Sequence, residues 1–110
     1  MNIKKNTPIV IRDSNFNEIL SNHRLVVVDF WAEWCSPCRA MNPIIEDLSN
    51  IYADQVTFVK LNVDENSIIP SKYSISSIPT FLIMKNSQVM ESIIGAVDQE
   101  IFENKINKYL

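Results

Sequence analysis

The feature that most constrains the fold of this chain is a run of almost unbroken apolar residues, Leu25–Trp31, with the sequence LVVVDFW. Three consecutive valines, without alternation with polar residues, are typical of a strand that is covered on both faces in a parallel sheet. We therefore place this run at the centre of a sheet. Its one charged residue is Asp29, which such a strand would bury.

Shorter signals place one strand and one helix before this run. Residues 9–11 (IVI) follow a proline and form a short strand candidate. Apolar residues at 16, 19 and 20 share a helical face, and Asp13 or Ser14 is positioned to cap the start of that helix. The chain is therefore expected to open as a strand followed by a helix.

The segment after the central run predicts a βαβ unit. Apolar residues recur at helical spacing between Met41 and Tyr52, so we expect a helix that begins near Cys35 and buries this stripe. Pro43 lies inside the helix, where a proline is expected to cause a kink. Residues 56–63 (VTFVKLNV) then return as a strand parallel to the central one.

The last third of the chain predicts a hairpin between two helices. We expect a short helix over residues 68–73. Residues 80–84 and 89–94 flank a turn at 85–88, which makes them an antiparallel hairpin added to the sheet. Asp98 is expected to cap a final helix that docks on the sheet. One face of that helix carries Phe102, Ile106, Tyr109 and Leu110.

Length and composition indicate one globular domain. The chain has 110 residues, of which 46% are hydrophobic and 21% charged, and this composition is typical of a protein that buries one core and folds alone. We expect a single domain over residues 1–110, with residues 1–6 as a short, flexible N-terminal extension. The sequence contains no repeat, linker or low-complexity segment.

Charge and hydropathy exclude several kinds of partner. The net charge is −3, so the chain lacks the basic field that neutralises phosphates or holds an anionic membrane, and we expect neither nucleic acid nor a membrane as a partner. The N-terminal lysines precede no apolar segment, and no stretch approaches the roughly 18 apolar residues of a membrane span. These observations predict a cytoplasmic protein, and we expect it to be a monomer.

The two cysteines, Cys35 and Cys38, stand where the central strand ends and a helix begins. A disulfide scaffold needs more cysteines at wider spacing. A zinc or iron–sulfur site usually needs about four ligands, and only His23 is available besides the cysteines, so we expect no metal. His23 lies among polar neighbours and is interpreted as solvated and not catalytic. The cysteine pair is therefore expected to carry out redox chemistry.

The position of Cys35 before a helix favours its role as the nucleophile. Unpaired backbone N–H groups and the positive end of the helix macrodipole stabilise a thiolate there. Pro37 is preset for a first helical turn, and the two-residue spacing holds the second sulfur close enough for a tight disulfide ring. Cys38 is therefore expected to resolve the mixed disulfide that Cys35 forms.

Asp29 is a candidate proton acceptor. An acid in a strand covered on both faces is costly to leave unpaired, and burial raises the pKa of a carboxyl group, which suits a group that accepts a proton near neutral pH. The alternative from the residues alone is that Asp29 faces solvent on a less buried strand.

A wider set of residues resembles the thioredoxin family in order and spacing. The set consists of DFWAEWCSPC, Pro43, Lys60, the Ile78-Pro79-Thr80 step and Gly95. The resemblance runs from about residue 7 to the end of the chain. It implies an α/β thioredoxin fold, with a mixed central sheet of five strands flanked by four helices. It also implies a protein-disulfide reductase that contributes to electron transport and cell redox homeostasis.

The resemblance assigns roles to particular residues. It implies that Asp29 lies buried behind the cysteines, with Lys60 beside it, and assists the deprotonation of Cys38. It also implies a cis bond between Ile78 and Pro79, opposite the cysteines, and backbone groups at Ile78 that pair with a bound peptide as a strand does. The apolar rim for the target chain then consists of Trp34, Ile78, Pro79, Gly95 and Ala96.

Some of these residues have plainer alternatives. Pro79 could simply start a strand, because only about 5% of X–Pro bonds are cis. Trp31 could serve as core packing, whereas Trp34 is interpreted as exposed for binding. Pro43 could act only on the shape of its helix.

The implied cycle begins when the Cys35 thiolate attacks a disulfide in a target protein. Cys38 then attacks the Cys35 sulfur, which releases the reduced target. The chain itself is expected to bind no cofactor. The resemblance suggests that a flavin- and NADPH-dependent thioredoxin reductase restores the dithiol, so the expected partners are this reductase and disulfide-containing target proteins.

The chain departs from the family pattern in its glycines, of which Gly95 is the single one. Ser36 stands between the first cysteine and the proline, where the family usually has glycine. Its hydroxyl could hydrogen-bond a backbone group or a sulfur and shift the balance between dithiol and disulfide. Ser77 and Ser87 also occupy places where glycine is common, so the turns there must take conformations that serine tolerates.

Two rival functions are compatible with the same sequence. A related enzyme could donate or isomerise disulfides in an oxidising compartment, which requires a less stable Cys35–Cys38 disulfide. A binding module could use the apolar rim in a larger assembly, with the cysteines incidental. The lack of a signal peptide argues against the first rival, and the intact cysteine pair with Asp29 and Pro79 argues against the second.

Overall fold

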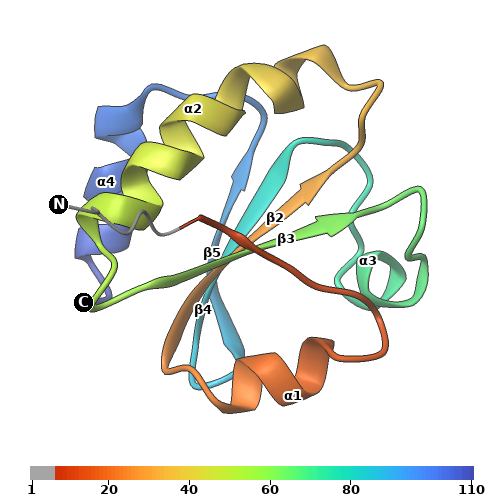
Figure 1. The fold of residues 1–110 in the computed structure, drawn as a ribbon, viewed down its shortest axis with the longest axis horizontal. Helices are drawn as coiled ribbons and strands as arrows, with labels where there is room; N and C mark the ends of the chain where they lie inside the picture. The colour runs from red at the N-terminus through yellow and green to blue at the C-terminus, as the bar shows by residue number, and fades with distance from the viewer. Residues whose placement is uncertain (1–6) are drawn as a thin grey trace, which may run out of the picture.

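The computed structural model describes residues 7–110, so the expected extension at residues 1–6 lies outside the described part of the chain. Figure 1 shows one sheet with helices on both of its faces. The strands are β1 (Ile9–Val10), β2 (Leu25–Trp31), β3 (Thr57–Asn62), β4 (Thr80–Lys85) and β5 (Gln88–Ile94). The helices are α1 (Phe16–Ser21), α2 (Ser36–Ile51), α3 (Ile68–Lys72) and α4 (Gln99–Asn107).

The sheet has the strand order β1-β3-β2-β4-β5, which puts β2 in the middle. Strand β2 pairs in parallel with β3 and antiparallel with β4, so the sheet is mixed and changes direction at its centre. The first six residues of β2 are buried, which confirms the prediction of a central, doubly covered strand. The expected α/β architecture of five strands and four helices is confirmed as well.

The two faces of β2 belong to two different cores. Leu25 and Val27 pack in a core with residues of α2 and α4, whereas Val26, Val28 and Phe30 pack in a core with residues of α1 and α3. Successive side chains of a strand point to opposite faces of the sheet. Asp29 therefore points to the same face as Val27, toward α2.

The predicted βαβ unit is present, and α2 begins directly after Cys35. Pro43 lies within α2, and the kink expected there stays a prediction. None of the helices in residues 7–110 combines the length and the apolar character that crossing a membrane requires.

The predicted cap of the first helix is wrong. The N-cap of α1 is Asn15, and Asp13 instead accepts hydrogen bonds at the start of α3, from the backbone N–H groups of Ile68 (3.0 Å) and Ile69 (2.9 Å). The first N–H groups of a helix have no partner within the helix, so a carboxylate from another part of the chain can satisfy them. Asp13 thus ties the segment before α1 to the start of α3.

The predicted hairpin is confirmed, with a two-residue turn at Asn86 and Ser87. These residues have φ angles of 52° and 66°, the left-handed region that this kind of hairpin turn requires. Ser87 therefore adopts a left-handed backbone conformation that is more common for glycine. Ser74 also has a positive φ, of 55°, whereas the φ of Ser77 is not positive.

The last helix docks through fewer residues than predicted. Phe102 and Ile106 are completely buried, and the hydroxyl of Tyr109 donates a hydrogen bond to Glu91 of β5 (2.9 Å). Leu110 was expected on the same face but is 43% exposed, because α4 ends at residue 107. Asp98 is the N-cap of α4 by position, although its side chain makes no capping hydrogen bond.

Candidate active site

Cys35 and Cys38 form a disulfide at the junction between β2 and α2. Their Cα atoms are 5.2 Å apart, a usual separation for a disulfide. Cys35 is the N-cap of α2, and its sulfur accepts a hydrogen bond from the backbone N–H of Cys38 (3.2 Å). The Cys35 sulfur is therefore held at a helix N-terminus, the position that stabilises a thiolate once the disulfide is reduced.

The two residues between the cysteines are both exposed and form the start of α2. Pro37 fits this first turn because a proline there gives up an N–H that has no partner within the helix. Ser36 carries the hydroxyl that could hydrogen-bond a backbone group or a sulfur. Within residues 7–110, the structure contains no hydrogen bond from this hydroxyl, so its predicted influence on the disulfide stays a prediction.

The disulfide lies in a small buried cluster that the cysteines form with Ala32. Trp31, Val63 and Ile78 pack against this cluster. The cluster leaves only 3% of Cys35 and 2% of Cys38 exposed. A partner must therefore bind closely over this region to reach the sulfurs.

The Ile78–Pro79 segment lies against the cysteines, and its peptide bond is cis, as the resemblance implies. The carbonyl oxygen of Pro79 accepts a hydrogen bond from the backbone N–H of Gly95 (2.8 Å), which joins this segment to the end of β5. Gly95 has a φ of +86°, a conformation that side chains rarely tolerate. The backbone N–H and C=O of Ile78 take part in no hydrogen bond with residues 7–110, so both are available to a bound chain.

An apolar hollow of about 290 Å³ opens beside this segment. It brings together Trp34 and Ile78, two residues of the predicted rim. The other three rim residues, Pro79, Gly95 and Ala96, lie outside its lining. Trp34 is 68% exposed. The rest of the lining consists of Val63, Pro70, Ile75, Ser76 and Ser77.

Val63, Pro70 and Ile75 belong to this surface, although the sequence did not predict it. Val63 closes a predicted strand, and Pro70 belongs to a predicted helix, so their patterns indicated core positions. Their position on this surface becomes visible only when the α3 region packs beside the cysteines. The closest hint in the sequence was Ile75, which lies three residues before Ile78.

Asp29 is almost fully buried, at 3% exposed. Burial raises its pKa from 3.8 to about 7, although the positive charge of Lys60 acts in the opposite direction. One carboxylate oxygen, Oδ1, has no hydrogen-bond partner in the described structure. The structure thus holds a carboxyl group that can gain or lose a proton close to neutral pH.

Asp29 and Cys38 face the same side of the structure. Asp29 lines a hollow of about 320 Å³ together with Asn42 and Ile45 of α2. Residues four and seven positions apart lie on one face of a helix, so Cys38, Asn42 and Ile45 form one row along α2. The row that carries Cys38 therefore continues into the wall of the hollow that contains Asp29.

Lys60 pairs with Asp29 in the register of β2 and β3. Its amino group lies over the ring of Trp31, 4.2 Å from the ring centroid, and makes no ion pair with Asp29 within 4.0 Å among the described residues. A cation over an aromatic face is attracted to it. Trp31 thus holds the amino group of Lys60, a contact that the sequence did not predict.

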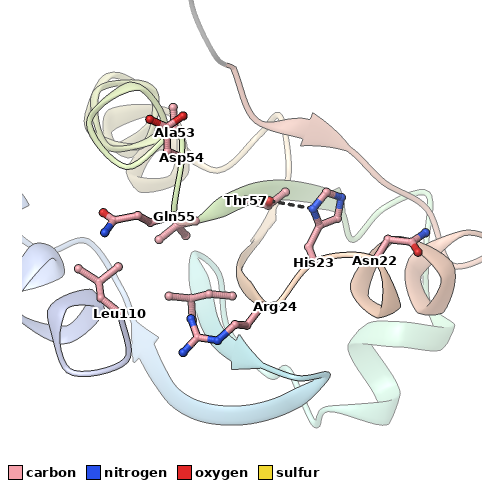
Figure 2. A pocket seen from close by; sticks show the side chains of 10 residues that line it. Asn22, His23, Arg24, Ala53, Asp54, Gln55, Thr57 and Leu110 are labelled. Atoms are coloured by element: carbon pink, nitrogen blue, oxygen red, sulfur yellow. Dashed lines mark hydrogen bonds between the residues drawn. The ribbon is translucent and has the colours of Figure 1, made fainter.

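His23 lies away from the cysteines, just before the opposite end of β2. Figure 2 shows its ring nitrogen Nδ1 bonded to the Thr57 hydroxyl, at a distance of 3.1 Å. The ring borders a hollow of about 400 Å³ that also includes Arg24 and Leu110. The sequence had suggested that His23 is solvated, but the residue is half-buried. Within residues 7–110, no three His, Cys, Asp or Glu side chains are grouped so that they could hold a metal ion.

Comparison with known proteins places these features in a family context. The family model described as Thioredoxin matches residues 7–108. The chain is 42% identical to Thioredoxin 1 of Synechococcus elongatus over 101 residues, which cover 91% of this chain and 94% of that protein. It is 43% identical to a thioredoxin of Chlorobaculum thiosulfatiphilum over 99 residues, covering 89% and 92%.

Two further matches extend the comparison. The chain is 43% identical over 102 residues to Thioredoxin M-type, chloroplastic, of Pisum sativum, covering 92% of this chain and 59% of that protein. A solved structure of a mutant thioredoxin from Halobacterium salinarum superposes with a TM-score of 0.87 at 24% identity, covering 99% of this chain and 96% of the other. At that identity, the structural match supports the fold alone.

Proposed function

The chain belongs to the thioredoxin family, and we propose that Cys35 is the attacking nucleophile and Cys38 the resolving cysteine of its disulfide-exchange reaction. The chain is a protein-disulfide reductase that works by dithiol exchange. Members of the family carry no cofactor of their own and receive electrons from thioredoxin reductase. The observation that carries the assignment is the Cys35 sulfur at the N-cap of α2, bonded to the N–H of Cys38.

The proposed reaction transfers two electrons from the cysteine pair to the target. The Cys35 thiolate attacks one sulfur of the target disulfide, forms a mixed disulfide, and releases the other target sulfur as a thiolate that takes up a proton. Cys38 loses its proton and attacks the Cys35 sulfur. The target leaves as a dithiol, and Cys35 and Cys38 remain joined as the disulfide present in the structure.

Asp29 is proposed as the group that takes the proton from Cys38. Its pKa of about 7 supports this role, because such a carboxyl group is partly ionised at neutral pH and gives up an accepted proton readily. Lys60 is proposed to tune this value, since its charge lowers the pKa of Asp29. Ser36 and Pro37 are proposed to influence the stability of the disulfide by shaping the start of α2.

The target chain is proposed to bind across the rim of Trp34, Ile78, Pro79, Gly95 and Ala96. The unpaired N–H and C=O groups of Ile78 support this proposal, because an extended target segment can pair with them as a strand would. The apolar hollow between Trp34 and Ile78 offers space for a target side chain next to the disulfide.

The test is reduction of insulin, a protein with disulfides, by NADPH and a thioredoxin reductase in the presence of this protein. Wild type is expected to turn over, Cys35→Ser is expected to be inactive, and Cys38→Ser is expected to accumulate mixed disulfides with the target. Turnover by Cys35→Ser, or mixed disulfides on Cys38 in that variant, would contradict the assignment.

A reduction potential measured in glutathione buffers separates the reductase from a disulfide donor. A value more reducing than that of the glutathione pool is expected for the proposed cycle. A clearly more oxidising value would favour the donation or isomerisation of disulfides.

The remaining proposals concern the whole protein. We propose a single domain that acts as a monomer in electron transport within the cytoplasm, where a glutathione pool keeps dithiols reduced. The continuous match of the family model to residues 7–108 supports the single domain. Light scattering and cell fractionation test the monomer and the location.

A further inference from the structure

Lys60 is a cation directly beside Asp29 that does not pair with it. The two residues are partners in the register of β2 and β3, so their side chains leave the same face of the sheet. Both line the hollow of about 320 Å³. Among residues 7–110, no ion pair joins them, and Oδ1 of Asp29 has no hydrogen-bond partner. A buried acceptor and a cationic donor thus share one hollow without bonding to each other.

The amino group of Lys60 lies instead over the ring of Trp31, 4.2 Å from the ring centroid. Trp31 follows Asp29 by two positions in β2, so its ring stands on the same face of the sheet as the carboxyl group. The ring also packs against the buried cluster that contains the cysteines. Its face is therefore a surface held in place by packing, and such a face attracts a cation.

Few other charges face Asp29 from the elements packed around it. On α2, Glu46 borders the hollow, but its exposed side chain makes no ion pair with Lys60 in the described structure. Cys38 of the same helix is held in the disulfide. On the β4 side, the partner of Asp29 is Phe81, which is uncharged. The remaining side chains of the hollow are also uncharged: Thr7, Pro8, Val10, Asn42 and Ile45.

From this arrangement we infer that Trp31 is a positioning residue for proton transfer: its ring holds the amino group of Lys60 and keeps the Asp29 carboxylate free of an ion pair. The inference rests on the proposed function only in taking Asp29 as the acceptor of the Cys38 proton. A carboxylate paired with an ammonium group is a weaker proton acceptor, because the opposite charge stabilises its ionised form. Without the ring, the flexible stem of the lysine allows its amino group to reach the carboxylate.

The central experiment measures the pKa of Asp29 in the oxidised protein by carbon-13 NMR of its carboxyl group. Trp31→Met removes the ring but keeps an apolar side chain that adapts to irregular space. We expect the pKa of Asp29 to fall by about 1 to 3, as for a carboxyl group that gains a cation nearby. Trp31→Phe keeps an aromatic face for the amino group, and we expect a pKa close to that of wild type.

A double-mutant cycle separates the charge of Lys60 from a change in the solvation of Asp29. Trp31→Met is repeated in a Lys60→Met background, where no amino group can move. There we expect the loss of the ring to leave the pKa of Asp29 almost unchanged. Trp34→Met is the matched control for the loss of a tryptophan, because Trp34 is 68% exposed and lies outside the lining of this hollow. We expect it to leave the pKa of Asp29 as in wild type.

The side chain of Lys60 provides a second readout, independent of activity. Protons over the face of a tryptophan ring are shielded, so we expect the ε-methylene protons of Lys60 upfield of their usual position in wild type. In Trp31→Met they should return to that position. In insulin reduction, Trp31→Met should also move the acid limb of the pH profile to lower pH, because Asp29 then ionises at lower pH.

Three results would overturn the inference. The first is an unchanged pKa of Asp29 in Trp31→Met. The second is an equal fall in the Lys60→Met background, which would make the entry of solvent the cause. The third is a Lys60 side chain that shows no shielding in wild type. Trp31→Leu is a second variant without a ring, for use if Trp31→Met does not fold.

The proposed function can fail separately from this inference. If wild type does not reduce insulin, the reductase assignment fails. If the pKa of Asp29 falls in Trp31→Met while the acid limb of the pH profile stays in place, the role of Asp29 as proton acceptor fails, and with it the part of Trp31 in proton transfer. In either case, the NMR measurements still decide whether Trp31 holds Lys60 away from Asp29.

Discussion

Replacing Asp29 with asparagine should stabilise the folded protein, and the gain should depend on pH. The substitution keeps the size and shape of the side chain but removes its ability to ionise. Asp29 is 3% exposed, and one of its oxygens has no hydrogen-bond partner in the described structure. Its ionised form is therefore poorly solvated in the folded state, which costs folding free energy.

The magnitude follows from the pKa. Burial raises the pKa of Asp29 from 3.8 to about 7, with the charge of Lys60 in opposition. One pKa unit corresponds to about 1.4 kcal/mol, so the difference of about 3 corresponds to about 4 kcal/mol. Because the pKa is higher in the folded than in the unfolded state, the unfolded chain releases the proton first as pH rises. The penalty is absent below 3.8, grows between 3.8 and about 7, and is constant above that range.

Urea unfolding of the oxidised protein between about pH 4 and about pH 8 measures this effect. The difference in the free energy of unfolding between Asp29→Asn and wild type should increase with pH. At about pH 8 it should be up to about 4 kcal/mol larger than at about pH 4. Asp47→Asn, which changes an exposed acid on α2, should show no such trend. A difference between Asp29→Asn and wild type that stays the same at every pH would refute the reasoning.

Three further predictions concern other charged contacts. Lys60→Met should raise the pKa of Asp29 further, because the positive charge that lowers it is gone, and should move the acid limb of the pH profile of insulin reduction to higher pH. Glu91→Gln should cost about 1 kcal/mol at neutral pH through its bond to Lys105 (2.8 Å). Hydrogen bonds lower the pKa of Glu91 below 4.5, so urea unfolding should show this stability above that pH and its loss as pH falls through the lowered value. Asp13→Ala should cost about 1 kcal/mol in thermal unfolding, since two N–H groups of α3 lose their acceptor.

Periodicity and residue type were enough to predict the elements of the fold. The almost unbroken apolar run of β2 indicated a strand with two covered faces. Such a strand lies inside a sheet, between neighbours on both sides. The same logic indicated that Asp29 would be buried. The depth of its burial and the direction in which it points depend on which face of β2 carries Asp29 and on the packing of α2 against that face.

Several contacts between distant residues were not predicted from the sequence. Asp13 was expected to cap the helix that follows it, but the carboxylate reaches α3, 55 and 56 positions away. Local capping rules consider only neighbouring residues, whereas the tertiary fold brings Asp13 to the start of α3. The Lys60–Trp31 contact and the Trp34–Asp64 bond depend in the same way on which segments the sheet brings together.

The hairpin turn illustrates a different limit. Asn86 and Ser87 have positive φ angles without a glycine, because the twist of the paired strands requires this turn. The sequence indicated a turn between β4 and β5. The pairing of the strands decided which backbone conformation the serine had to accept.

The burial of the disulfide has a kinetic consequence. Only 3% of Cys35 and 2% of Cys38 are exposed, so a protein that exchanges electrons with the sulfurs must contact the small surface around them. Under the proposed cycle, the target and the reductase must each contact this small surface, and neither can do so while the other is bound. The protein should therefore follow ping-pong kinetics, without a ternary complex. Oxidised target and reductase should compete for the same surface, so an excess of either should inhibit the reaction with the other.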